Sequence, residues 1–230
     1  MKQLALDIGL ASGPTLENFQ PGSNAQALQH LRLAVGEAGA LRSPVPTYLW
    51  GLPGTGKSHL LRAVYEALRA QGVLVGWLDP GMRWPTSFDE RWAAVLLHDV
   101  QHYSEAQQAA AFNWFINAID PAVGPPRWVL AAGDLPPADL PLREDLRSRL
   151  AWGHVFQLQP LGDEDLRAVL RRQASERGMV LAGEVLDYML NHFSRDLGSL
   201  AQLLDRLDAF ALQTQRALTI PLIKSMLQGD

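Results

Sequence analysis

The residues with the types and spacing to do chemistry begin with the segment Gly51-Leu52-Pro53-Gly54-Thr55-Gly56-Lys57-Ser58. It fits the phosphate-loop pattern, which is a glycine, four residues, and then Gly-Lys-Ser. In such a loop the glycines allow successive backbone N–H groups to point at phosphate oxygens, and the lysine neutralises the phosphates. The hydroxyl of Ser58 is the expected ligand of Mg²⁺. The segment therefore predicts a nucleotide site.

Two acids stand where neighbouring predicted strands end. A phosphate loop needs an acid at the tip of a nearby strand to support Mg²⁺, and a second group to align the reaction. Asp99 ends an apolar run and is our candidate for the Mg²⁺ shell, while Asp134 ends the next run and could sense the terminal phosphate. Arg149 lies on a later predicted helix, and a cation supplied from outside strongly accelerates phosphoryl transfer. We therefore nominate Asp99, Asp134 and Arg149 as catalytic residues.

The elements that must position these residues alternate along the chain. Apolar runs predict short strands, and helical periodicity between them predicts helices, which together indicate a parallel sheet covered on both faces. From Gly162 onward only helices are predicted, as a small separate domain. The predicted strands are 45–50, 73–78, 92–99, 127–134 and 155–158. The predicted helices are one ending near 40, then 59–68, 104–120, 142–152, 163–177, 184–195, 198–215 and 220–227, the third opened by a Ser104…Gln107 capping box.

Composition excludes several classes of protein. The chain has 230 residues, enough for one α/β domain with a small appendage. The absence of cysteine excludes a disulfide framework and thiolate metal sites, and suits a reducing cytoplasm. We expect no membrane association, because no apolar run is long enough to span a bilayer. The formal charge of −4 does not favour general nucleic-acid binding.

The first residues alternate between apolar and polar types. Leu4, Leu6 and Ile8 alternate after Gln3, and a loose Ala-Ser-Gly-Pro stretch follows. Such a peptide can be an edge strand of its own domain, or an extended segment that docks into pockets of a partner. The residues alone leave both readings open.

Five segments together resemble one family, the AAA+ ATPases related to the replication initiator DnaA, which include small regulators that inactivate DnaA. The phosphate loop alone would indicate only a superfamily, but the sensor 1, arginine-finger and lid segments are more specific. The similar segments are Phe19–Asn24 (entry), Gly51–Leu61 (phosphate loop with His59), Gly133–Pro137 (sensor 1), Leu146–Gly153 (arginine finger) and Arg216–Pro221 (end of the lid).

The resemblance implies an AAA+ core with a parallel sheet and a C-terminal helical lid, and a function in replication. Gly51, Pro53, Gly54, Thr55, Gly56, Lys57, Ser58 and His59 would bind ADP or ATP with Mg²⁺, held by Ser58 and Asp99. Gln3, Leu4 and Leu6 resemble the short peptide by which such regulators dock on the replicase sliding clamp, which favours the docking reading. Arg149 would act on ATP held by DnaA. Because DnaA continues into a DNA-binding domain and this sequence stops at Asp230, we expect only indirect contact with DNA.

The sequence departs from the family at two positions. The third strand of the family ends in an aspartate that supports Mg²⁺, and His98 stands there. Either Asp99 substitutes, or metal support is weakened, because neutral imidazole is a poor Mg²⁺ ligand. The lid position that carries the sensor 2 arginine matches Gly198, with Arg195 one turn earlier. We therefore expect weak intrinsic ATP hydrolysis.

The resulting hypothesis is a cytoplasmic negative regulator of replication initiation, built from a docking peptide (1–14), an AAA+ core (15–160) and a lid (161–230). It would bind the clamp and stimulate hydrolysis of DnaA-bound ATP, and homo-oligomerisation stays open. One alternative is an autonomous AAA+ ATPase that remodels or loads proteins on DNA. Another is a clamp-binding adaptor with a decayed nucleotide pocket.

Overall fold

The structure, a computed structural model, describes residues 13–39 and 42–228. Residues from Gly13 to Pro160 form one compact unit, and those from Leu161 onward form a second. Within the described ranges, no helix combines the length and the apolar character needed to cross a bilayer.

The first unit is a five-stranded parallel sheet with the strand order β2-β3-β4-β1-β5. Each strand is separated from its sequence neighbour by a crossover, so the carboxyl ends of all the strands lie at one edge. The strands are β1 (Thr47–Trp50), β2 (Leu74–Leu78), β3 (Trp92–Leu97), β4 (Trp128–Gly133) and β5 (His154–Gln157).

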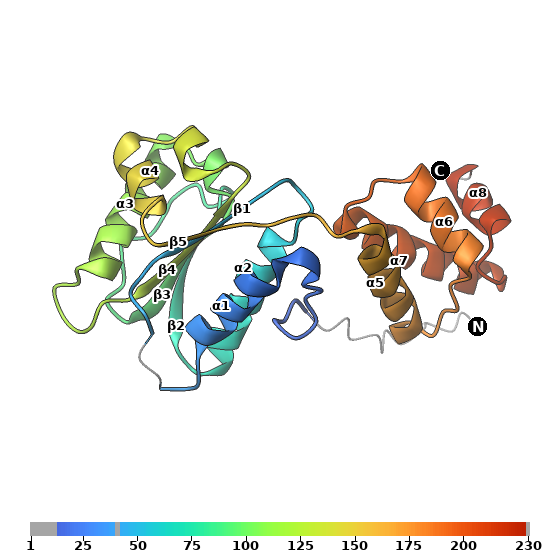
Figure 1. The fold of residues 1–230 in the computed structure, drawn as a ribbon, viewed down its shortest axis with the longest axis horizontal. Coiled ribbons are helices and arrows are strands. Elements are labelled where there is room, and N and C mark those ends of the chain that lie inside the picture. The colour runs from blue at the N-terminus through green and yellow to red at the C-terminus, as the bar shows by residue number, and fades with distance from the viewer. Residues whose placement is uncertain (1–12, 40–41, 229–230) are drawn as a thin grey trace. The chain divides into compact units, whose positions relative to one another are not determined.

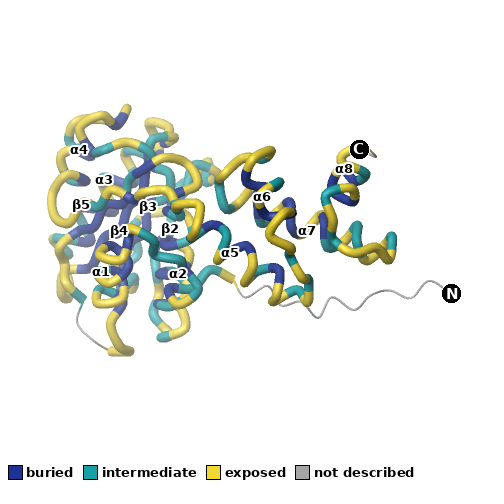
Figure 2. Tube along the Cα trace, turned by 45° about the vertical axis from the view of Figure 1, so that its right-hand side comes forward, coloured by how far each residue is buried: buried dark blue, intermediate teal, exposed yellow. Residues whose placement is uncertain are grey.

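Helices cover both faces of this sheet (Figure 1). Side chains alternate between the faces along each strand. On β4, Trp128 and Leu130 pack in the cluster that contains α1 (Ala25–Val35) and α2 (Lys57–Ala70). Val129 and Ala131 pack instead with α3 (Glu105–Ile119) and α4 (Glu144–Leu150). Figure 2 shows the central strands as the most buried part of this unit. Single-turn 3₁₀ helices lie at η1 (Gly22–Asn24), η2 (Val100–His102) and η3 (Pro137–Asp139).

The entry segment is tied to the far end of the unit by a buried asparagine. Asn24 donates from Nδ2 to the carbonyl of Gln159 at 2.9 Å and accepts from the Gln159 amide at 2.7 Å. These reciprocal bonds satisfy both the amide and the carbonyl of Gln159, just beyond the edge strand β5. They fix the start of α1 beside the end of the sheet.

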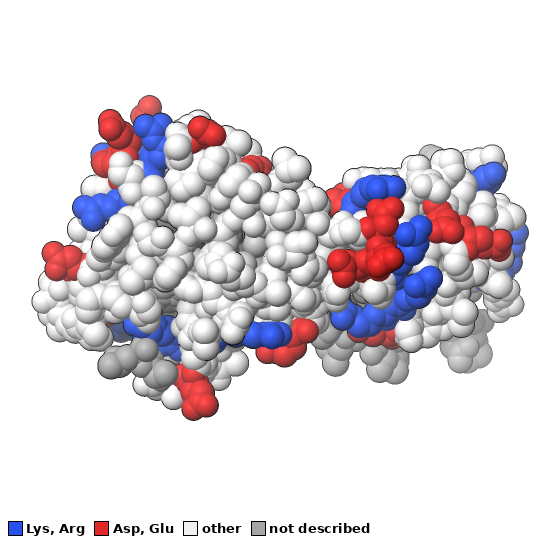
Figure 3. All heavy atoms as spheres, viewed as in Figure 1, with Lys and Arg blue, Asp and Glu red and all other residues white. Residues whose placement is uncertain are grey.

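The second unit contains four helices, α5 (Asp163–Glu176), α6 (Gly183–His192), α7 (Leu197–Thr214) and α8 (Ile220–Gln228). Their apolar faces, with Leu170, Leu186, Leu204 and Ile223 among the fully buried residues, enclose a separate core. On the surface seen in Figure 3, basic and acidic side chains lie interspersed over these helices. Ion pairs join them, for example Arg167 with Asp187 at 2.7 Å.

The predicted α/β core with a helical C-terminal part is confirmed, and differences lie at element ends. The third strand stops at Leu97 rather than Asp99, because Asp99 takes a left-handed conformation (φ 50°) that leaves the strand. The first helix stops at Val35 rather than near Ala40, because Gly36, with φ 57°, ends it. The capping box is confirmed, with the Ser104 amide donating to Gln107 at 2.8 Å.

Candidate functional site

The phosphate loop runs from the end of β1 to the start of α2. Gly54 and Gly56 have φ of 81° and 93°, which side chains adopt only with strain. A Cβ on Gly56 would lie 2.6 Å from Cε2 of Phe19, and one on Gly51 would lie 2.4 Å from the carbonyl oxygen of Leu158. Both the backbone angles and the packed neighbours therefore require glycine, and they fix the curve of the loop.

The start of α2 supplies hydrogen-bond donors for an anion. Gly56 is the N-cap and has no side chain to satisfy the first turn, and the first intrahelical donor is the Leu60 amide, at 3.0 Å from the Gly56 carbonyl. The preceding N–H groups of the helix have no intrahelical acceptor, and the helix dipole adds positive potential there. This is the arrangement in which helix N-termini bind phosphate.

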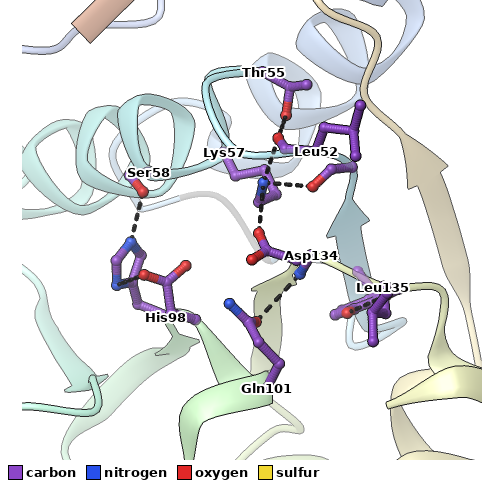
Figure 4. Close-up of polar contacts among 11 residues, drawn as sticks. Leu52, Thr55, Lys57, Ser58, His98, Gln101, Asp134 and Leu135 are labelled. Atoms are coloured by element: carbon purple, nitrogen blue, oxygen red, sulfur yellow. Dashed lines mark hydrogen bonds and ion pairs between the residues drawn. The ribbon is translucent and has the colours of Figure 1, made fainter. Parts of the chain in front are cut away.

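Lys57 is almost fully buried at this helix start. Its Nζ donates to the carbonyls of Gly51 at 2.6 Å and Leu52 at 2.9 Å, and lies 3.0 Å from Oδ1 of Asp134 (Figure 4). Thr55 closes the same turn, since its hydroxyl donates to Leu52 at 2.9 Å. The ammonium charge is therefore held at the centre of the loop with each of its hydrogens engaged.

Asp134 follows β4, the strand next to β1, and two side chains bind the backbone of Asp134 and of the next residue, Leu135. Its amide donates to Oε1 of Gln101 at 3.2 Å. The hydroxyl of Tyr48 donates to the carbonyl of Leu135 at 2.7 Å, and burial together with the charge of Asp134 raises the Tyr48 pKa. A Cβ on Gly133 would lie 2.4 Å from that hydroxyl. Gln101 and Tyr48 thus position the acid, and no spacing rule in the sequence indicated either residue.

His98 reaches Ser58 from the end of β3. Its Nε2 lies 2.8 Å from the Ser58 hydroxyl oxygen (Figure 4). The indole of Trp77 stacks on the imidazole, with ring centroids 5.6 Å apart and an interplanar angle of 23°. The His98 pKa is lowered, first by burial and then by the charges of Arg62 and Lys57, against opposing effects of Asp99 and Asp79. A lowered pKa favours neutral imidazole at pH 7.

Asp99 lies beside the opposite side of the same ring. Its Oδ2 is 3.5 Å from Nδ1 of His98, the nitrogen that does not face Ser58. The left-handed backbone of Asp99 (φ 50°, ψ 50°) is uncommon for a residue with a side chain, and such strain is often found at functional sites. The structure therefore brings Ser58, His98 and Asp99 together, with the imidazole between the hydroxyl and the carboxylate.

These residues do not match the donor set of a Mg²⁺ site. Mg²⁺ prefers oxygen ligands and is usually held through carboxylates and phosphates. The Ser58 hydroxyl contacts an imidazole nitrogen, whereas the predicted ligand Asp99 faces the other ring nitrogen. Over the described part of the chain, no group of three or more His, Cys, Asp or Glu residues could hold a metal ion.

His59, the last of the predicted loop residues, is engaged elsewhere. Its Nε2 lies 3.0 Å from the carbonyl oxygen of Thr15, and its ring lies 5.5 Å from that of Phe19. Burial lowers its pKa, while the bond to Thr15 opposes that shift. His59 therefore ties the entry segment to α2. Pro53 and Gly54 form the exposed tip of the loop.

Arg149 lies near the carboxyl end of α4, a helix of seven residues. Arg143, which precedes this helix, donates to Asp145 at 2.6 and 2.7 Å. Within residues 13–39 and 42–228, neither Arg147 nor Arg149 forms an ion pair or a side-chain hydrogen bond. Among the described residues, Arg149 thus has no acid that would compete for its charge.

Two further predicted positions are less informative. In the second unit, Arg195 donates to Asp163 at 2.9 Å, and Gly198 lies in the first turn of α7. Gln3, Leu4 and Leu6, the predicted clamp-docking residues, lie outside the described residues.

Comparison with protein families gives a match within the C-terminal unit. Residues 163–227 match the family described as the lid domain of Hda.

Solved structures share the whole fold. Domain III of the Thermotoga maritima replication initiation protein DnaA superposes with a TM-score of 0.75 at 19% identity, covering 99% of this chain and 98% of that one. AMPPCP-bound DnaA from Aquifex aeolicus gives 0.68 at 23% identity, over 89% of this chain and 68% of that one. A Thermotoga maritima RuvB mutant gives 0.65 at 17% identity, over 94% and 72%. At these identities the likeness shows an AAA+ fold.

Proposed function

We propose that this chain, a DnaA-related AAA+ protein with an Hda-type lid, is a negative regulator of DNA replication initiation. It holds an adenine nucleotide at Gly51–Ser58 and docks on the sliding clamp through Gln3, Leu4 and Leu6. It then presents Arg149 to ATP bound by DnaA and stimulates hydrolysis of that ATP. Its parts are the docking peptide 1–14, the core 15–160 and the lid 161–230, and it acts in the cytoplasm.

Nucleotide binding is supported by the complete set of phosphate-loop groups. The loop has its glycines in left-handed conformations, its lysine buried at the centre and an uncapped helix start. These groups provide the donors and the positive charge that phosphates require. The DnaA structure from Aquifex aeolicus contains AMPPCP, which makes an adenine nucleotide the first ligand to test.

The observation that carries the regulatory proposal is the uncommitted guanidinium of Arg149. An arginine supplied to another molecule's nucleotide stabilises the charge that develops on the transferred phosphoryl group, and it adds about 10³ to 10⁵ in rate. Such a residue needs a guanidinium without a competing acid. Among the described residues this holds for both Arg147 and Arg149, and the resemblance of Leu146–Gly153 to the arginine-finger segment selects Arg149.

Weak hydrolysis of the chain's own nucleotide completes this proposal. At the end of β3, an imidazole rather than a carboxylate contacts Ser58. Glycine stands at the lid position where the resemblance implies an arginine, and Arg195 is bound to Asp163. Asp134 and Asp99 remain as candidates for sensing phosphate and aligning water in this chain's own pocket. The faster hydrolysis of DnaA-bound ATP is assigned to Arg149.

The decisive test measures hydrolysis of ATP preloaded on DnaA, with sliding clamp on DNA and with wild-type chain or Arg149→Ala. We expect Arg149→Ala to lose most of the stimulation, and Arg147→Ala on the same helix to keep it. Equal stimulation by Arg149→Ala and wild type would remove the finger role. Brisk DNA-stimulated turnover without DnaA would instead support an autonomous ATPase.

A further inference from the structure

We infer that the nucleotide pocket of this chain binds its nucleotide without a divalent cation, because His98 occupies the position from which an acid would support the cation. This inference rests on the proposed binding of a nucleotide at Gly51–Ser58. It concerns the form of the ligand, free nucleotide rather than its magnesium complex.

The first argument is the contact made by the Ser58 hydroxyl. In a phosphate loop this hydroxyl is a ligand of Mg²⁺, and an acid at the tip of the neighbouring strand supports the metal shell. Here the residue at that tip is His98, and its Nε2 lies 2.8 Å from the hydroxyl oxygen. The stack on Trp77 holds the imidazole in this orientation.

The second argument is the charge around this contact. The acids near His98 are turned to other partners. Asp79 accepts from the Trp77 indole at 2.8 Å and from the Gly81 amide at 2.8 Å, and Asp99 faces the far nitrogen of the imidazole. On the His98 ring, the charges of Arg62 and Lys57 are opposed by those of Asp99 and Asp79. No carboxylate oxygen among the described residues is hydrogen-bonded to Ser58, so no acid is in place at that hydroxyl to support a divalent cation.

The third argument is that the pocket supplies other partners for phosphate. Lys57 and the N–H groups at the start of α2 provide charge and donors. Because the Asp99 carboxylate faces Nδ1, the neutral imidazole is favoured with its hydrogen on Nδ1, and Nε2 then accepts from the Ser58 hydroxyl. The Ser58 hydroxyl is thereby turned to the imidazole, and the phosphates are bound by Lys57 and the N–H groups of α2.

The test compares the affinity of the full chain for fluorescent N-methylanthraniloyl-ADP in excess EDTA and in millimolar MgCl₂. We expect the two dissociation constants to agree within about threefold. His98→Asp restores an acid beside Ser58, and its affinity should become at least about tenfold higher in MgCl₂ than in EDTA. His98→Gln is neutral and should behave as wild type. The matched control is His102→Asp, which adds the same charge at an exposed position and should leave the ratio unchanged.

A wild-type affinity that falls about tenfold or more in EDTA would overturn the inference. If Asp99→Asn then abolished that dependence, Asp99 would be the metal-supporting residue. Absence of binding in both buffers by a folded protein would refute the nucleotide site itself, and the inference with it. Should His98→Asp fail to fold by circular dichroism, the wild-type comparison and His98→Gln still decide the question.

Discussion

The Nζ of Lys57 lies 3.0 Å from Oδ1 of Asp134, and this ion pair joins the phosphate loop to the end of the adjacent strand β4. Lys57 is nearly inaccessible to solvent, whereas the side chain of Asp134 is 31% exposed. A nucleotide phosphate entering the loop would compete with the Asp134 carboxylate for the same ammonium. The pair therefore links occupancy of the loop to the position of the predicted phosphate sensor.

Asp134→Asn should bind ADP more tightly than wild type, by up to about fivefold, because a partly exposed ion pair contributes about 0.2 to 1 kcal/mol. Removing the carboxylate leaves the Lys57 charge available to the phosphates. Isothermal titration calorimetry measures the change, and Lys57→Met is the reference for a pocket without its cation. Loss of binding in Asp134→Asn as severe as in Lys57→Met would contradict this competition.

Gly56→Ala should destabilise the protein more than Gly72→Ala. Both glycines have left-handed φ, 93° and 77°, and an alanine there costs about 1–2 kcal/mol. Only at Gly56 does the new Cβ meet a neighbour, Phe19 at 2.6 Å, whereas nothing lies within 4 Å at Gly72. The clash adds about 1–3 kcal/mol. Urea unfolding of the two variants measures the difference, and equal losses would show that Phe19 does not restrict the loop.

Unfolding stability should fall as the pH drops below about 6.5, the ordinary pKa of histidine. Burial lowers the pKa of both His30 and His59, and His154 lowers that of His30 further. The unfolded chain then binds protons at a higher pH than the folded chain. The stabilisation is therefore complete above the unfolded pKa and is lost as the pH falls through the folded pKa.

His30 illustrates the cost of protonation. Its Nε2 lies 2.9 Å from the hydroxyl of Thr47, which also accepts from the Trp128 indole at 3.2 Å. Because the Thr47 oxygen accepts the indole hydrogen of Trp128, the Thr47 hydroxyl donates its own hydrogen to Nε2 of neutral His30. Urea midpoints at pH 7.5 and 5.5 should differ less in His59→Gln and His30→Gln than in wild type. The exposed His102→Gln is the control, and an unchanged difference in all three variants would refute the assignment.

Docking on the sliding clamp should depend on the first residues of the chain. Gln3→Ala/Leu4→Ala should lose at least about tenfold in clamp affinity, since a short extended peptide concentrates its binding in a few side chains that fill pockets. Surface plasmon resonance with immobilised clamp measures this, and Lys2→Ala serves as the matched control. Equal affinity of the double variant and wild type would exclude this peptide as the docking segment.

The sequence by itself determined the local features of this protein. The spacing from Gly51 to Ser58 predicted a phosphate loop between a strand and a helix, because glycine, lysine and serine act there within one turn of backbone. Apolar runs and helical periodicity located the strands and helices to within a few residues, since side-chain direction follows backbone geometry. The capping box of α3 was readable for the same reason.

The tertiary structure decided which distant residues meet at that loop. His98 and Ser58 are 40 residues apart, and only the strand order that sets β4 between β3 and β1 brings Asp134 to Lys57 and the end of β3 to the start of α2. The sequence named both His98 and Asp99 at the end of one strand. In the structure the imidazole, and not the carboxylate, contacts Ser58, and Asp99 takes a left-handed conformation on the far side of the ring. Which of two adjacent side chains contacts Ser58 depends on backbone angles and on packing across the sheet edge, and no pattern of neighbouring residues encodes these.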